Sequence, residues 1–147
     1  MEREDRFSGV GGNAFAYVAH PPIIVSTLAC TAMIEEIGAE YINQFVSGKS
    51  VDLNKTRASD ILETLADEFP NHPDFDISAI DETIVTARHD IAHYLRKRPE
   101  AVTVENHEEH MAQGLASIRL VGMLADQLLT QVVQDYRNRV LQEIVKR

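Results

Sequence analysis

The sequence predicts an all-α protein, an antiparallel bundle of four to five helices that ends in a long C-terminal helix. Apolar residues recur every three or four positions over most of the chain, no stretch alternates as a half-buried strand would, and tryptophan is absent. The 147 residues are enough for one hydrophobic core and too few for two ordinary domains. We therefore expect residues 1–147 to form a single helical domain.

The first twenty residues differ in pattern from the rest of the chain. Residues 1–20 combine charges with a glycine-rich stretch and show no sustained periodicity, which predicts a flexible N-terminal arm. A first helix then runs from about Pro22 to Ser47, with Gly48 as its C-terminal stop. Its predicted inward positions are Leu28, Ile34, Ile37, Tyr41, Ile42 and Phe45.

Two further helices are predicted in the middle of the chain. One begins near Thr56 or Ser59 and ends before Pro70, because proline does not continue a helix. The next is capped by Asp76 or Ser78 and reaches about Lys97. The apolar positions of the earlier helix are Ile61, Leu62, Leu65, Ala66 and Phe69.

The final helix is predicted from about Thr103 almost to the C-terminus. If straight, it would be ~60 Å long, about twice the diameter of a small domain. It must therefore kink or protrude, and Gly114 and Gly122 are the expected soft points. Its predicted core stripe is Met111, Leu115, Ile118, Ala125, Leu128, Val132, Tyr136, Val140 and Ile144.

Charge is distributed unevenly along the chain. The formal net charge of −9 disfavours a polyanionic partner, since like charges slow the encounter. Residues 88–98 nevertheless carry a net charge of +3, from Arg88, Arg96, Lys97 and Arg98 against Asp90. A basic patch on an acidic protein is therefore expected around this segment.

The single cysteine and the apolar runs bear on the compartment. Cys30 excludes an internal disulfide and fits a small buried residue in a reducing environment. The longest apolar run, Ile23 to Ile34, is interrupted by hydroxyl residues and is too short for a membrane span. The acidic first residues lack the basic region of a signal peptide. We expect a cytoplasmic protein with no membrane partner.

The segment Arg88-His89-Asp90-Ile91-Ala92-His93 carries most of the chemistry in this chain. At 100° per residue, the core stripe of its helix contains Ile80, Ile84 and Ala87, while His89 and His93 point almost oppositely. Arg88 lies at the edge of the stripe, from which its long side chain reaches the histidine face. A guanidinium that stabilises charge and an imidazole that moves protons suit the cleavage of a phosphodiester.

This segment resembles the motif of the HEPN (higher eukaryotes and prokaryotes nucleotide-binding) superfamily. The motif is an arginine, four to six residues and a histidine, with a polar residue after the arginine, and here His89 occupies the polar position. The resemblance implies a helical bundle that forms a homodimer in which two motifs line one cleft. It also implies a metal-independent endoribonuclease that needs no cofactor and acts on RNA in a toxin or defence system.

The resemblance further implies roles for single residues. His93 would act as general acid or base while the ribose 2′-OH attacks the adjacent phosphate, and Arg88 would bind that phosphate. His89 would orient the groups or share proton transfer. The basic residues Arg96, Lys97 and Arg98 are the expected substrate-binding residues.

The resemblance also bears on partner proteins. Some family members are toxins beside an antitoxin, so an antitoxin or other partner protein is among the expected partners. In one such group a tyrosine two residues after the histidine is modified by a nucleotidyltransferase. Here Tyr94 follows the histidine directly and Leu95 takes the modified position, which disfavours that partner. Other members have lost catalysis, and a non-catalytic helical module that assembles with a partner enzyme is the alternative function.

Other constellations of the same residue types are open at this point. His89 and His93 are spaced as two metal ligands on one helix, which the segment His107-Glu108-Glu109-His110 would complete, although that segment is more simply an exposed first turn. His89-Asp90 is also similar to the central pair of the HD phosphohydrolases, with His72 and Asp126 as outer ligands. The first helix also carries three acidic residues, Glu35, Glu36 and Glu40. They form a solvated face, or one of them pairs with Arg88 and positions it.

Overall fold

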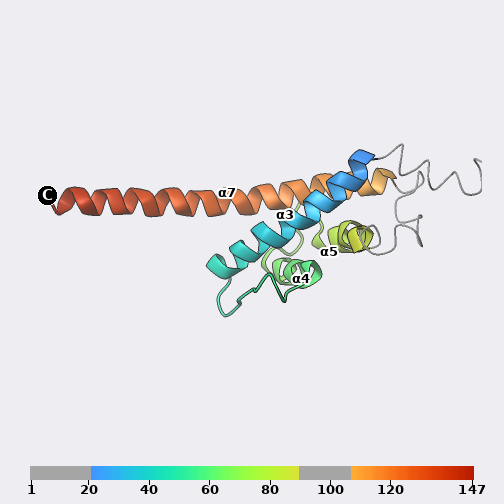
Figure 1. The fold of residues 1–147 in the computed structure, drawn as a ribbon, viewed down its shortest axis with the longest axis horizontal. Coiled ribbons are helices and arrows are strands. Elements are labelled where there is room, and N and C mark those ends of the chain that lie inside the picture. The colour runs from blue at the N-terminus through green and yellow to red at the C-terminus, as the bar shows by residue number, and fades with distance from the viewer. Residues whose placement is uncertain (1–20, 90–106) are drawn as a thin grey trace, which may run out of the picture.

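The computed structural model describes residues 21–89 and 107–147, and all regular secondary structure in these ranges is helical (Figure 1). The predicted all-α class and long C-terminal helix are confirmed, whereas the predicted arm, residues 1–20, lies outside the described ranges. No helix among the described residues has both the length and the apolarity of a membrane span. The helices are α3 (Pro21–Phe45), α4 (Ala58–Glu68), α5 (Ile77–Ile80), the π-helix η1 (Asp81–Val85) and α7 (His107–Val145).

The turn after α3 folds the chain back towards the bundle. Gly48 adopts a φ of +74°, a left-handed conformation that glycine tolerates, as expected for the predicted helix stop. The Asn43 side chain then holds both backbone groups of Val51, accepting from its N–H at 2.7 Å and donating to its carbonyl at 3.1 Å. These bonds place the loop that leads to α4 against the end of α3.

The core lies between the inward faces of α3, α4, α5, η1 and the first half of α7. α3 and α4 approach closely at Gly38, where an added Cβ would lie 2.7 Å from Cγ2 of Ile61. Two predicted inward residues of α3 are corrected, because Leu28 and Phe45 are 39% and 38% exposed. The largest fully buried apolar side chains are Ile34, Ile42, Ile61, Leu62, Leu65, Ile80, Ile84, Leu120 and Leu124.

α3 and α7 lie side by side and run in the same direction, so this pair departs from a strictly antiparallel arrangement (Figure 1). Near their starts, the Cys30 thiol lies 3.8 Å from the Gly114 carbonyl oxygen. Near the end of α3, Phe45 shares a surface hollow with Gln127 and Gln134 of α7. Small and hydroxyl-bearing side chains fill the contact and allow close approach, namely Thr27, Cys30, Thr31, Ala116 and Ser117.

Apart from Leu128, which packs against the core, the face that α7 presents to the core is not the predicted one. Met111, Leu115, Ile118, Val132, Tyr136 and Ile144, assigned to the core stripe, are all exposed. The buried face carries Ala116, Leu120, Val121 and Leu124 and also His110, which was expected in an exposed first turn. The physical reason is that α7 has two apolar faces, and the bundle buries the one with smaller side chains. α7 continues unbroken through Gly114 and Gly122, and its second half protrudes from the bundle (Figure 1).

Candidate active-site groove

Arg88 and His89 lie on the helical segment that follows η1. Asp76 caps the start of this helix by accepting hydrogen bonds from the backbone N–H groups of Ser78 and Ala79 at 3.0 and 3.3 Å, so the first of the two predicted caps is the one used. Ile80, Ile84 and Ala87 are buried, as the predicted stripe requires. His89 is exposed and Arg88 is partly exposed, which confirms that both lie off the core face.

A π-helical turn separates the cap from the motif. The backbone N–H of Thr86 bonds to the carbonyl oxygen of Asp81, five residues earlier, and the Thr86 hydroxyl donates to the same oxygen at 3.3 Å. Asp81 also accepts a hydrogen bond of 2.7 Å from the hydroxyl of Ser59 at the start of α4. The wide turn is therefore tied to α4, and π-helical turns are frequent at functional sites.

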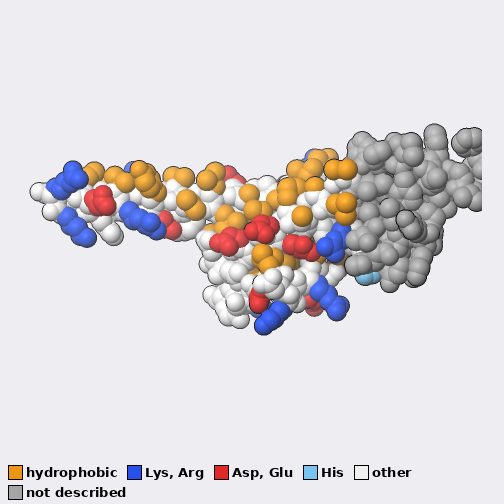
Figure 2. Space-filling view, in the orientation of Figure 1, with side chains coloured by type: hydrophobic (Ala, Val, Ile, Leu, Met, Phe, Trp, Pro, Cys, Tyr) orange, Lys and Arg blue, Asp and Glu red, His pale blue; other side chains and the backbone are white. Residues whose placement is uncertain are grey.

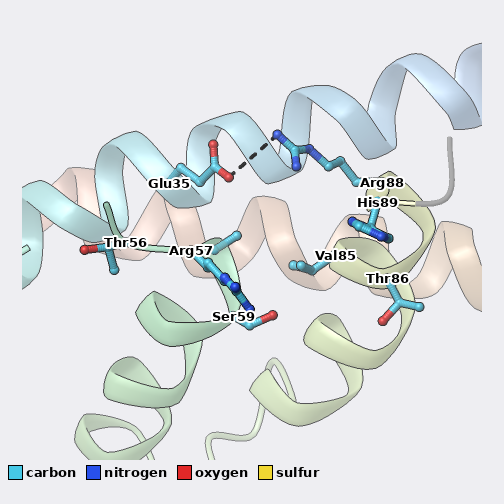
Figure 3. A pocket seen from close by; sticks show the side chains of 9 residues that line it. Glu35, Thr56, Arg57, Ser59, Val85, Thr86, Arg88 and His89 are labelled. Atoms are coloured by element: carbon cyan, nitrogen blue, oxygen red, sulfur yellow. Dashed lines mark ion pairs between the residues drawn. The ribbon is translucent and has the colours of Figure 1, made fainter. Parts of the chain in front are cut away.

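A groove of about 630 Å³ lies between three elements and is bordered by the two motif residues (Figure 3). α3 contributes one side, the start of α4 and the two residues before it contribute the second, and η1 with the helical turn that follows it contributes the third. We call this the motif groove; it is lined by Glu35, Thr56, Arg57, Ala58, Ser59, Val85, Thr86, Arg88 and His89.

An ion pair crosses the top of the motif groove. Nη2 of Arg88 lies 4.0 Å from Oε1 of Glu35, and the two side chains point toward one another (Figure 3). Of the two interpretations of the acidic residues of α3, a partner that positions Arg88 is confirmed for Glu35, whereas Glu36 and Glu40 are exposed. The paired side chains are 39% and 31% exposed, so the pair contributes at most about 1 kcal/mol to stability. An anion can therefore displace Glu35 at small cost.

The motif groove is more basic than the chain as a whole. Arg57 and Arg88 line it against one carboxylate, that of Glu35, while the whole chain carries a net charge of −9. Arg57 immediately precedes α4, and its backbone N–H donates to the Asp60 carboxylate at 3.2 Å. The positive end of the α4 dipole adds to the field at this side. Two guanidinium groups, an imidazole and hydroxyl groups around one cavity suit a phosphate-containing ligand.

Sequence reasoning missed Arg57 as a groove residue. The arginine stands thirty-one positions before Arg88, and no local pattern connects the two. They share one groove because the α4 start packs beside η1, which the Ser59 to Asp81 hydrogen bond records. The nearest sequence signal was the helix start predicted near Thr56 or Ser59.

The other predicted site residues fall outside the described part of the chain. These are the general acid or base His93 and the substrate-binding residues Arg96, Lys97 and Arg98. The structure thus brings Arg88 and His89 to one groove and leaves their relation to the remaining four residues undescribed.

The described residues do not support the alternative metal sites. No cluster of three His, Cys, Asp or Glu side chains able to hold a metal ion occurs within residues 21–89 and 107–147. His110 is buried in the bundle, while Glu108 and Glu109 are exposed. His72 stacks on Phe75 with ring centres 4.0 Å apart, and its Nδ1 accepts from the Asp74 backbone N–H at 3.2 Å. His72 therefore has a structural role in its loop.

The chain matches no protein-family model, no curated protein sequence and no solved structure.

Proposed function

We propose that this chain is a metal-independent endoribonuclease of a toxin or defence system, with the motif groove as part of its active site. The observation that supports the proposal most directly is that Arg88 and His89 line the same groove, together with the second guanidinium of Arg57. The similarity of the segment 88–93 to the HEPN motif supplies the reaction class. The proposal places the protein in the cytoplasm, where RNA is available.

In the proposed reaction, a ribose 2′-OH attacks the adjacent phosphorus. His93 removes the proton from the 2′-OH or delivers one to the leaving 5′ oxygen, because an imidazole titrates near neutral pH. The new bond joins O2′ to phosphorus, the bond from phosphorus to O5′ breaks, and the products are a 2′,3′-cyclic phosphate and a 5′-OH. No oxidant, reductant or cofactor enters this balance.

Arg88 stabilises the negative charge that develops on the phosphate oxygens. A planar guanidinium matches two of those oxygens, and such charge-assisted hydrogen bonds are among the strong ones in proteins. Glu35 pairs with Arg88 across the groove, and because this pair is weak and partly exposed, a phosphate can replace Glu35 as the partner of Arg88. His89 orients the scissile phosphate or shares the second proton transfer. Arg57, with Arg96, Lys97 and Arg98 as further candidates, binds neighbouring phosphates.

The proposal is tested with purified protein and mixed RNA in EDTA, followed by analysis of the new 3′ ends. Wild type is compared with Arg88→Ala, His93→Ala and the matched control Arg119→Ala, which removes an exposed arginine of α7 outside the groove. We expect cyclic-phosphate ends from wild type and the control and at least a hundredfold loss in the other two variants. No cleavage by folded wild type, or equal cleavage by all variants, would refute it.

A non-catalytic assembly module is the second candidate function. It is favoured by the row of large apolar side chains that α7 leaves exposed, because monomeric proteins rarely expose long apolar surfaces. In this case an antitoxin or a partner enzyme would carry the activity. Folded wild type would then show no cleavage in EDTA or with added metal ions, while RNA cleavage would appear only in the complex with the partner.

A further inference from the structure

The outer face of α7 carries a continuous apolar row that the bundle does not cover. Its large members are Met111, Leu115, Ile118, Leu129, Val132 and Tyr136, each at least 49% exposed. In Figure 2 hydrophobic side chains follow the helix far beyond the bundle. We call this row, continued by Val140 and Ile144, the α7 stripe.

Between Met111 and Tyr136 the spacing of the α7 stripe is that of a two-stranded coiled coil, whereas Val140 and Ile144 follow at intervals of four residues. From Leu115 to Tyr136 its positions follow one another at intervals of three, four, three, four, three and four residues, with Gly122 and Ala125 in the middle. An average of 3.5 residues keeps one seam facing a partner helix along its length. A Cβ at Gly122 would meet no atom of residues 21–89 and 107–147 within 4 Å, so the packing of these residues does not require a glycine there. A close approach by a second helix does account for it.

The two halves of α7 carry opposite net charges, which favours one direction for a helix that packs on the stripe. Residues 107–127 have a net charge of −2, from Glu108, Glu109 and Asp126 against Arg119. Residues 128–147 have a net charge of +2, from Arg137, Arg139, Lys146 and Arg147 against Asp135 and Glu143. A parallel copy would set like charges beside each other, whereas an antiparallel copy sets the acidic half against the basic half.

The bundle leaves room for this arrangement. Ala116, Leu120 and Leu124 bury the opposite side of α7 against the core, so the rest of the described chain does not cover the stripe. Leu128 is the last described residue of α7 that packs on the core, and the following 17 residues of helix extend ~25 Å without core support. Helical stability in proteins comes mainly from packing of an apolar face, so a partner helix would stabilise this segment.

We propose that two copies of this chain associate through their α7 stripes as an antiparallel helix pair. The pairing runs end to end, with Met111 of one copy near Ile144 of the other and the small residues Gly122 and Ala125 near the middle. The partner on the α7 stripe is a second copy of this chain, because one α7 provides both the apolar seam and two halves of opposite net charge. The inference does not depend on ribonuclease activity.

The first test is the mass of the protein in solution, by light scattering after size exclusion and by sedimentation. We expect wild type at twice 16.5 kDa, and a shift to 16.5 kDa for the double variant Val132→Glu/Tyr136→Glu. The matched control Gln134→Glu/Asn138→Glu adds the same two charges on the other side of the same helix and remains dimeric. Circular dichroism establishes that both variants keep the helical bundle. A monomeric wild type at 100 μM, or equal behaviour of the two variants, would overturn the proposal.

The second test concerns direction and uses engineered cysteines in a Cys30→Ala background. Under mild oxidation, the double variant Met111→Cys/Ile144→Cys forms a covalent dimer, because the antiparallel pairing brings unlike positions together. Ile144→Cys alone remains uncrosslinked, since its counterpart lies at the far end of the partner helix. A disulfide requires Cα atoms within about 7 Å, which makes the readout selective. Efficient crosslinking of Ile144→Cys alone would refute the antiparallel arrangement.

Discussion

Replacing Glu35 with glutamine removes the charged partner of Arg88 while keeping the shape of the side chain. The two groups lie 4.0 Å apart, and their Coulomb energy at that distance is about 1 kcal/mol in water and about 4 kcal/mol at an effective dielectric constant of 20. Because both side chains are about a third exposed, measured values for exposed pairs apply, which are roughly 0.2 to 1 kcal/mol. The Glu35→Gln variant should therefore unfold with a free energy within about 1 kcal/mol of wild type.

The same substitution should strengthen RNA binding, because phosphate no longer competes with Glu35 for Arg88. An energy of up to 1 kcal/mol corresponds to an affinity increase of up to about fivefold. The assay is fluorescence anisotropy with a mixed-sequence 2′-O-methyl RNA, in which the attacking hydroxyl is blocked. The gain should shrink as salt rises from 50 to 300 mM, since ions screen exposed charges.

Glu36→Gln is the matched control for this prediction. It removes the same charge from the neighbouring position of α3, and Glu36 is exposed and does not line the motif groove. Any gain common to both variants reflects the net charge of the protein, and only the excess in Glu35→Gln reports the contact with Arg88. Equal affinities of the two variants would refute the competition between Glu35 and phosphate.

Three further predictions concern the stability and reactivity of the bundle. Gly38→Ala should destabilise the fold by about 1 to 3 kcal/mol in urea unfolding, because the new Cβ lies 2.7 Å from the Ile61 side chain; an unchanged midpoint would contradict the close approach of α3 and α4. Asp76→Ala should lower the free energy of unfolding by about 0.5 to 2 kcal/mol through loss of the α5 cap, whereas Asp76→Asn should keep most of it. Burial raises the pKa of the Cys30 thiol, and the hydrogen bond with Ser26 lowers it by a smaller amount. Because the thiol is buried and stays protonated, a thiol reagent at pH 8 should react with Cys30 only after unfolding. Rapid reaction of the folded protein would contradict this.

Local signals made the middle of the bundle predictable from the sequence. The Asp76 side chain caps its helix as such residues commonly do, and Ile61, Leu62 and Leu65 are buried on one face of α4. The Gly48 stop is equally local, because a positive φ favours glycine. Each of these features is signalled by a few neighbouring residues, so the local sequence pattern was enough to predict it.

The buried face of α7 was not predictable in the same way. Periodicity identifies apolar faces, but it does not say which one faces the core when a helix has two. The larger side chains of the α7 stripe suggested the core, whereas the bundle buries Ala116, Ser117 and Leu120, which fit against the closely packed α3. The same limit applies to Arg57, whose place in the motif groove depends on how α4 packs beside η1. Both the buried face of α7 and the position of Arg57 depend on how segments distant in the sequence pack together.

The motif groove and the α7 stripe belong to different surfaces, and this separation bears on how the protein works. Residues from α3, the start of α4 and η1 line the groove, and none of the described lining residues belongs to α7. Pairing through the α7 stripe thus leaves Glu35 and Arg88 unchanged within each chain. RNA affinity per chain should consequently survive Val132→Glu/Tyr136→Glu, because each chain retains its own guanidinium groups. Loss of cleavage with unchanged binding would instead show that the reaction itself requires the association of two chains.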